Sequence, residues 1–371
     1  MKAELKTAII LGAGIAVTVA GISIAFSYVE TNSFQPAEII SDGEIDEIKN
    51  IDKSNLRKAP EIHGITNYIN TDPNELQKKI KDKVVLYDIW TYSCINCIRT
   101  LPYVTAWHEK YSDEGLVIVG IHSPEFEFEK NLDNVKKAVD KHGIKYPVVM
   151  DNDWIMWDAF DNRYWPRKYV ADHEGYIRYD HIGEGAYKET EMVIQQLLKE
   201  RAVSLGMDAK TESNLVDISE FEHTKSRSPE LYFGYELAQG RSQLGNPEGF
   251  KQDTVANYSM PDELKHNHFY LDGEWKNARD HMELVSETGT IKLSYHAKQV
   301  NIVTGGKATL TVTLDGNQLP EKYAGNDIAN GIVNITEPDL YNIINSNEAS
   351  THTLEIMVNE PGFRIYTFTF G

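Results

Sequence analysis

Two different patterns of apolar and polar residues occur in two successive parts of this chain. Between residues 84 and 201, short apolar and β-branched runs alternate with stretches in which apolar residues recur at helical spacing. This alternation predicts an α/β unit spanning residues 59–201. We expect its strands at residues 84–89, 116–121 and 147–150 and as a pair around 172–175, and its helices from Cys94 onward and over residues 128–142 and 188–201.

From residue 228 the pattern changes to a period of two. Apolar and polar side chains alternate at residues 291–295, 310–314, 354–358 and 366–370, with turn residues between these runs. Several short strands without intervening helices predict an all-β sandwich, of the jelly-roll kind, over residues 228–371. Residues 202–227 are polar and weakly patterned, and we interpret them as a linker.

The N-terminal segment shows a third pattern, a continuous stretch without charged residues. Residues 7–29 are apolar or small and carry no charge, and Lys2 and Lys6 precede them. At about 1.5 Å per helical residue this stretch can cross a hydrocarbon core of about 30 Å. We therefore expect residues 1–29 to form a single-pass membrane anchor, with the remainder on the extracytoplasmic side. The alternative is a cleavable signal peptide with a cleavage site at Ala25-Phe26-Ser27. The protein would then be secreted.

The rest of the chain looks like a soluble extracytoplasmic protein. Residues 30–58 are polar and acid-rich, which is typical of a spacer. The net charge of −19 argues against nucleic acid or anionic lipid as a partner of the soluble part.

The candidate chemistry is concentrated in the only two cysteines, Cys94 and Cys97. Their spacing, between an expected strand and an expected helix, is typical of a redox motif. A cysteine in the first helical turn meets unpaired N–H groups and the positive end of the helix dipole, which favour the thiolate. We therefore expect Cys94 to attack and Cys97 to resolve the mixed disulfide, with no other cofactor. Reduced core cysteines, or weak zinc or copper binding together with His122, remain alternatives.

Other candidate residues flank this motif. Asp88 lies inside the apolar strand, where burial should raise its pKa and make it a proton acceptor for Cys97. The alternative is an aspartate at the solvated end of the strand. Trp90 is expected to pack beneath the motif. Trp165-Pro166 enters a later strand, and a proline there is compatible with a cis peptide bond facing the sulfurs.

Further motifs surround the cysteines and continue to the end of the chain. They are Ala59-Pro60-Glu61, residues 64–67, the WTYSCINC run at residues 90–97, residues 120–126, Tyr164-Trp165-Pro166, residues 183–185, Tyr187, and residues 228–235 and 363–371. Together they resemble the extracytoplasmic thiol-disulfide oxidoreductases of the TlpA/ResA type, which have a thioredoxin-like fold. More narrowly, they resemble the C-terminal soluble part of DipZ proteins.

This resemblance implies roles for individual residues. Cys94 and Cys97 would form the redox pair, with Pro166 as the cis proline and Asp88 as the buried acid. Protein thiols or disulfides would be the substrates. DipZ proteins carry a multi-helix membrane electron conduit that this sequence does not show, so we expect a separate membrane protein as electron donor. Residues expected near the reacting sulfurs are Trp90, Tyr92, Ser93, Ile95, Asn96, His122, Glu125 and Trp165.

In DipZ proteins the β module resembles a carbohydrate-binding module. The aromatic candidates for a glycan platform here are Trp275, Tyr270 and Tyr295, but core packing is the favoured interpretation because aromatics alternating along strands are usually buried. Four histidines of this region are interpreted as surface residues rather than metal ligands: His266, His268, His281 and His296.

Two classes of function therefore compete. The first is a membrane-tethered thiol-disulfide oxidoreductase. The second is a glycan- or protein-binding module for which the α/β domain is mainly a scaffold. The cysteine motif favours the first. A peroxidase is disfavoured because Ile89 stands where peroxiredoxins have a proline. We also expect the β domain to dock near Cys94, with residues 231–233 and Tyr235 as its anchor.

Overall fold

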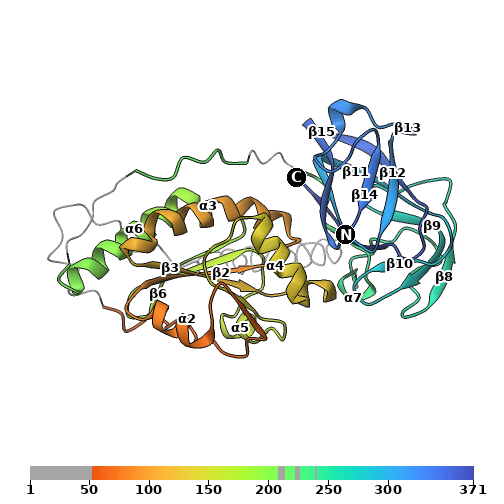
Figure 1. The fold of residues 1–371 in the computed structure, drawn as a ribbon. Coiled ribbons are helices and arrows are strands. Elements are labelled where there is room, and N and C mark those ends of the chain that lie inside the picture. The colour runs from red at the N-terminus through yellow and green to blue at the C-terminus, as the bar shows by residue number, and fades with distance from the viewer. Residues whose placement is uncertain (1–51, 208–213, 222–225, 239) are drawn as a thin grey trace, which may run out of the picture.

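The computed structural model describes residues 52–207, 214–221, 226–238 and 240–371. They form an α/β domain and an all-β domain that lie side by side (Figure 1). The predicted anchor at residues 1–29 lies outside the described residues. Within the described residues, no helix is both long and apolar enough to span a membrane.

The α/β domain is built on a mixed sheet with the strand order β1-β4-β3-β2-β5-β6. Strands β2, β3 and β4 are parallel, whereas β1, β5 and β6 pair antiparallel with their neighbours. The strands are β1 (Asn67–Ile69), β2 (Val84–Trp90), β3 (Leu116–His122), β4 (Val148–Met150), β5 (Arg167–Ala171) and β6 (Ile177–Ile182). Because β2 and β3 are adjacent and parallel, the segments that follow them start at the same edge of the sheet.

Helices cover both faces of this sheet (Figure 1). Helices α3 (Ile95–Tyr111), α4 (Leu132–Lys141) and α6 (Tyr187–Ser204) pack on one face, and α2 (Pro73–Ile80) and α5 (Ile155–Ala159) pack on the other. Strand β2 shows why both faces need cover, since every one of its side chains is buried. Its alternate residues contribute to the two opposite cores.

The expected elements of the α/β domain are confirmed, with one difference at the predicted helix 128–142. The structure instead has a 3₁₀ turn, η3 (Glu127–Lys130), followed by α4 from Leu132. Asn131 separates the two because its side chain caps α4 by accepting the N–H of Asp133 at 2.9 Å. A second 3₁₀ turn, η2 (Ser112–Glu114), follows α3.

The second domain is all-β, as predicted. Its strands are β7 (Leu231–Tyr232), β8 (Val255–Tyr258), β9 (Phe269–Asn277), β10 (Met282–Leu284), β11 (Gly289–Gly305), β12 (Ala308–Leu314), β13 (Asn317–Gln318), β14 (Ile332–Ile335), β15 (Asp339–Val358) and β16 (Arg364–Phe370), with the short helices α7 (Tyr235–Ala238) and η4 (Glu321–Tyr323). Hydrogen bonds join these strands into one connected sheet rather than the two separate sheets expected of a sandwich. The long strands β11 and β15 change register near Ala297 and Val300, where β11 passes from pairing with β9 to pairing with β16.

The predicted spacer and linker are partly held against the α/β domain. The spacer's last residues pack on it, since Lys53 forms an ion pair with Asp172 at 2.8 Å. Within the linker, the backbone N–H of Val216 donates to the Glu191 carboxylate at 3.0 Å. These contacts mean that the ordered α/β domain starts before residue 59 and extends past residue 201.

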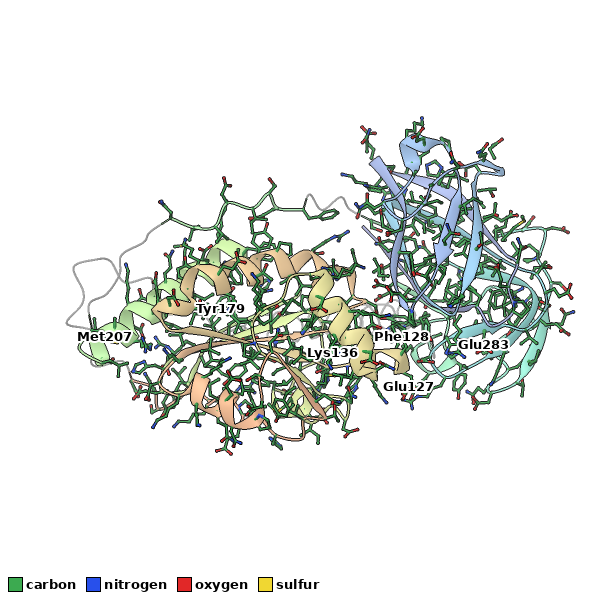
Figure 2. All side chains as sticks on the ribbon, viewed as in Figure 1. Glu127, Phe128, Lys136, Tyr179, Met207 and Glu283 are labelled. Atoms are coloured by element: carbon green, nitrogen blue, oxygen red, sulfur yellow. The ribbon has the colours of Figure 1, made fainter. Side chains whose placement is uncertain are left out.

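The two domains meet through an apolar cluster, as predicted. Phe126 and Phe128 of the α/β domain pack against Tyr366 of the β domain, with ring centroids 5.1 and 4.7 Å apart. Figure 2 labels Phe128 at this junction. Ile95 and Ile98, in the first turn of α3, pack against the same cluster. The β domain therefore covers the start of the helix that follows the cysteine motif.

The prediction that residues 231–233 and Tyr235 dock the β domain on the α/β domain is only partly correct. Leu231 and Phe233 belong to the core of the β domain, and Tyr235 donates its hydroxyl to Asp253 of the same domain at 3.0 Å. Tyr232 belongs to the cluster between the domains, and its hydroxyl donates to Glu125 of the α/β domain at 2.8 Å. The alternation along β7 explains this result, because neighbouring strand residues point to opposite faces.

Candidate active site

The two cysteines stand at the start of α3. Cys94 is the N-cap residue, and its sulfur accepts the N–H of Cys97 at 3.4 Å. A backbone donor aimed at this sulfur stabilises a negative charge on it. Cys94 is partly exposed, whereas Cys97 is 1% exposed, and both are free thiols. Only Cys94 is therefore accessible to an incoming partner.

Burial raises the pKa of the Cys97 thiol well above its ordinary value, and the neighbouring Cys94 raises it further. Cys97 is thus held as a thiol until a base removes its proton. This difference between the two sulfurs matches the expected order of attack, with Cys94 first and Cys97 second.

Asp88 lies on the same face of β2 as the residues that pack against α3, and it is 1% exposed. Burial raises its pKa from 3.8 to about 6, and the ammonium group of Lys168 opposes this rise. One of its carboxylate oxygens has no hydrogen-bond partner among the described residues. The expectation of a buried aspartate is confirmed, and the solvated alternative is wrong. A carboxylate with one free oxygen and a pKa near neutrality is suited to accept a proton.

Lys168 is a residue of this site that sequence reasoning missed. It pairs with Asp88 in the antiparallel register of β2 and β5, and it is fully buried. Burial lowers its pKa to about 8, although Asp88 and Cys97 oppose the shift. Its ammonium group donates to the carbonyl of Gly183 at 3.1 Å. The only signal in the sequence is a pair of neighbouring charged residues, Arg167 and Lys168, at the start of an otherwise apolar strand.

The Asp88 carboxylate should destabilise the reduced protein at neutral pH. The pKa of Asp88 is about 6 in the folded protein and 3.8 for an ordinary aspartate. The ionised carboxylate therefore lowers the free energy of unfolding fully above pH 6 and not at all below pH 4. Asp88→Asn should therefore raise the free energy of unfolding at pH 7 by about 1–2 kcal/mol and change it little at pH 4. Urea unfolding with dithiothreitol at both pH values measures this. Destabilisation at pH 7 would contradict the assignment.

Aromatic rings hold His122 beside the motif. His122 is fully buried between Trp90 and Tyr92, with ring centroids at 5.3 and 5.8 Å. Burial lowers its pKa to about 3, so the imidazole is neutral. Trp90 is buried as expected, and the Tyr92 hydroxyl donates to the carbonyl of Pro338 in the β domain at 3.4 Å.

A buried glutamate, Glu129, supports the segment before Cys94 and was also missed. Its carboxylate accepts the hydroxyl of Ser93 at 2.6 Å and the backbone N–H groups of Glu125 and Phe126 at 2.6 and 2.9 Å. These bonds tie the motif to the η3 turn. The helix predicted over residues 128–142 includes Glu129, but nothing in its pattern singles this residue out.

Trp165 lines the same cavity as Cys94, and Pro166 follows it in the chain. Their peptide bond is cis, as expected, and Pro166 is buried. The indole of Trp165 donates to the carbonyl of Ser123 at 3.0 Å, which fixes the ring. Trp165 also packs against Trp154 and Trp157.

Both domains contribute to a cavity of about 150 Å³ that contains Cys94. The first-turn residues Ile95 and Asn96 line it, as the sequence predicts for near-site residues. The other lining residues are Ser93, Glu125 and Trp165 from the α/β domain and Ser228, Glu230, Tyr232, Thr367, Thr369 and Phe370 from the β domain. Any group that reacts with Cys94 in this arrangement therefore contacts the β domain as well.

The proposed glycan platform is not available at the three named aromatics. Trp275 and Tyr295 are fully buried and Tyr270 is 2% exposed, so core packing is confirmed. His266, His268, His281 and His296 are exposed or partly exposed. Among the described residues no cluster of three or more His, Cys, Asp or Glu side chains could hold a metal ion, and His122 is enclosed by aromatic rings instead.

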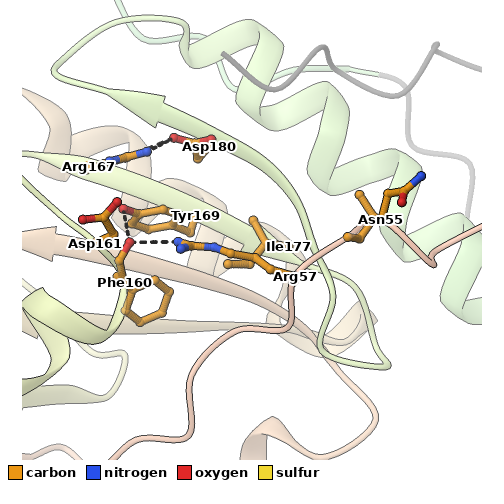
Figure 3. Close-up of a pocket in the computed structure, with 9 residues that line it drawn as sticks. Asn55, Arg57, Phe160, Asp161, Arg167, Tyr169, Ile177 and Asp180 are labelled. Carbon is orange, nitrogen blue, oxygen red and sulfur yellow. Dashed lines mark hydrogen bonds and ion pairs between the residues drawn. The ribbon is translucent and has the colours of Figure 1, made fainter. Parts of the chain in front are cut away.

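A larger hollow of about 280 Å³ lies in the α/β domain, lined by residues that include Arg57, Arg167 and Asp180 (Figure 3). Its charged groups already have partners. Arg167 pairs with Asp180 at 2.5 Å, and Arg57 donates to the carbonyl of Phe160 at 2.8 Å. Neither cysteine lines this hollow.

Comparison with known proteins covers both domains. Residues 57–197 match the Redoxin family, and residues 228–371 match a thioredoxin-like C-terminal domain family. The chain is 35% identical to protein DipZ of Mycobacterium tuberculosis (strain CDC 1551 / Oshkosh) over 317 residues. The aligned region covers 84% of this chain and 43% of DipZ. The chain thus spans less than half of that relative.

Two further matches concern the α/β domain. Thiol-disulfide oxidoreductase YkuV of Bacillus subtilis (strain 168) is 30% identical over 141 residues, which cover 38% of this chain and 94% of YkuV. The solution structure of a thioredoxin-like protein in its oxidized form matches with a TM-score of 0.36 and 30% identity, over 39% of this chain and 97% of that one.

Proposed function

Because this chain belongs to the family of thioredoxin-like thiol-disulfide oxidoreductases, we propose that it exchanges disulfides with protein thiols through Cys94 and Cys97. The observation that carries the proposal is the unequal pair of sulfurs at the start of α3. Cys94 is partly exposed and accepts an N–H, whereas Cys97 is buried and its pKa is raised in part by the charge of Asp88, itself a carboxylate of raised pKa.

The exchange proceeds in two steps. The Cys94 thiolate attacks a substrate disulfide, forms a mixed disulfide and expels one substrate sulfur as a thiolate, which takes a proton from water. Asp88 then accepts the Cys97 proton, and the Cys97 sulfur attacks Cys94 and expels the second substrate sulfur. Two electrons pass to the substrate, and a Cys94–Cys97 disulfide remains. The reverse sequence oxidises a substrate dithiol.

Lys168 has a supporting role in this scheme. Its ammonium group favours the ionised form of Asp88 and also of Cys97. It therefore stabilises the negative charge that passes from one group to the other during the second step. Trp165 lines the cavity at Cys94, and we propose that this ring and the neighbouring Pro166 lie against the substrate chain.

We further propose that the protein works at the extracytoplasmic face of a membrane, anchored by residues 1–29. The apolar stretch 7–29 supports this idea, and so does the similarity to DipZ. A separate membrane protein would then exchange electrons with the Cys94–Cys97 pair.

A protein-disulfide assay tests the proposed activity. The pre-reduced protein should reduce the interchain disulfides of insulin, and the rate should increase in proportion to protein concentration. A Cys94→Ser/Cys97→Ser double variant provides the background rate. If the wild-type rate equals that background with insulin and with a second disulfide protein, the proposed function is wrong.

A further inference from the structure

The cavity at Cys94 carries two carboxyl groups that the redox chemistry does not use. Glu125 comes from the α/β domain and Glu230 from the β domain, and both line the cavity. The hydroxyl of Tyr232 lies 2.8 Å from an oxygen of each. No lysine, arginine or histidine is among the residues that line the cavity.

This arrangement leaves the carboxyl groups short of donors. A phenolic hydroxyl has one proton, so Tyr232 can donate to only one of the two groups at a time. Burial raises the pKa of Glu125 and of Glu230, and the repulsion from Glu230 adds to the shift at Glu125. The charge of Arg241, which lies over the ring of Tyr232 at 4.7 Å, lowers the pKa of both groups in part, but Arg241 does not line the cavity.

A second observation also indicates a missing ligand. Thr369 lines the same cavity and is 7% exposed, and its hydroxyl has no hydrogen-bond partner among the described residues. A buried hydroxyl without a partner costs free energy, which a bound polar group can recover. The side chains of Glu125, Glu230 and Thr369 thus present oxygen atoms to a ligand that brings hydrogen-bond donors.

We propose that this cavity selects substrates that carry a lysine or arginine beside the reacting cysteine. The inference rests on the proposed function and specifies its substrate class. A volume of about 150 Å³ admits a group about the size of benzene, which corresponds to one side chain. An ammonium or guanidinium group entering next to Cys94 supplies the donors that Glu125, Glu230 and Thr369 lack, as charge-assisted hydrogen bonds.

A set of matched peptides tests this inference in the full chain. Disulfide-linked dimers of a short peptide are prepared with lysine, norleucine or glutamate next to the cysteine, and kcat/KM for their reduction is measured. Norleucine keeps a linear apolar side chain without the charge. We expect kcat/KM for the lysine peptide to exceed that for the norleucine peptide about tenfold, with the glutamate peptide slowest. Salt should reduce the difference.

Variants then locate the source of the preference. Glu125→Gln/Glu230→Gln should bring the lysine-to-norleucine ratio close to one, while Glu263→Gln, an exposed glutamate of the β domain outside the cavity, should leave it unchanged. A wild-type ratio near one, or a preference that survives in the double variant, overturns the inference while leaving the redox function intact. Failure to reduce any of the peptides would instead count against the proposed function.

Discussion

Replacing Cys94 by serine should reduce disulfide exchange to the uncatalysed rate. A serine hydroxyl neither ionises near neutral pH nor forms a disulfide, so the first step is lost. Cys97→Ser should behave differently, because Cys94 is still able to attack. That variant should accumulate a mixed disulfide with the substrate, visible as an adduct on non-reducing gels and by mass spectrometry.

The order of the two sulfurs can be checked independently by alkylation of the reduced protein. Iodoacetamide should modify Cys94 faster than Cys97 at neutral pH, because Cys97 is 1% exposed and its pKa is raised by burial. Peptide mapping after short exposure identifies the modified residue. Faster modification of Cys97 would reverse the roles assigned to the two residues.

Replacing Asp88 by asparagine should slow the second step by about a hundredfold, which is within the usual range for losing a general base. In the wild-type protein the rate at which the mixed disulfide resolves should rise with pH through about 6, because only the ionised carboxylate accepts the Cys97 proton. The variant should lack this rise. Stopped-flow measurement of the intrinsic fluorescence change during resolution gives the profile.

An exposed aspartate provides the matched control. Asp113→Asn changes the net charge equally, but Asp113 is exposed in the turn after α3. Its resolution rate and pH profile should match those of the wild type. If Asp88→Asn keeps the wild-type profile as well, another group accepts the proton.

Much of this site could be predicted because its signals are local in the chain. Cys94 and Cys97 were identified by their spacing and by the strand and the helix on either side of them. Asp88 was identified because it is an acidic residue within an apolar run. The cis bond before Pro166 is not visible in spacing and followed from the family resemblance. Each of these features depends on a few neighbouring residues or on a recognisable motif.

The residues that were missed depend on contacts between distant segments. Lys168 faces Asp88 only because β5 pairs with β2 in one register. Glu129 is buried because the η3 turn folds back onto Ser93. No local pattern encodes either contact.

The β domain shows the same limit. The alternating pattern predicted its strands, but it did not predict which side chains of β7 point toward the α/β domain. Tyr232 points to the α/β domain whereas Leu231 and Phe233 point into the core. One residue of offset along a strand reverses which side chain meets the active site.

A redox titration tests the central claim most directly. The protein is equilibrated in dithiothreitol buffers of graded potential and quenched with an alkylating agent, and the masses of the Cys94 and Cys97 peptides are measured. We predict one reversible two-electron transition between two alkylated cysteines and a Cys94–Cys97 disulfide. Persistence of two free thiols across the whole range, or disulfides only between separate molecules, would contradict the account.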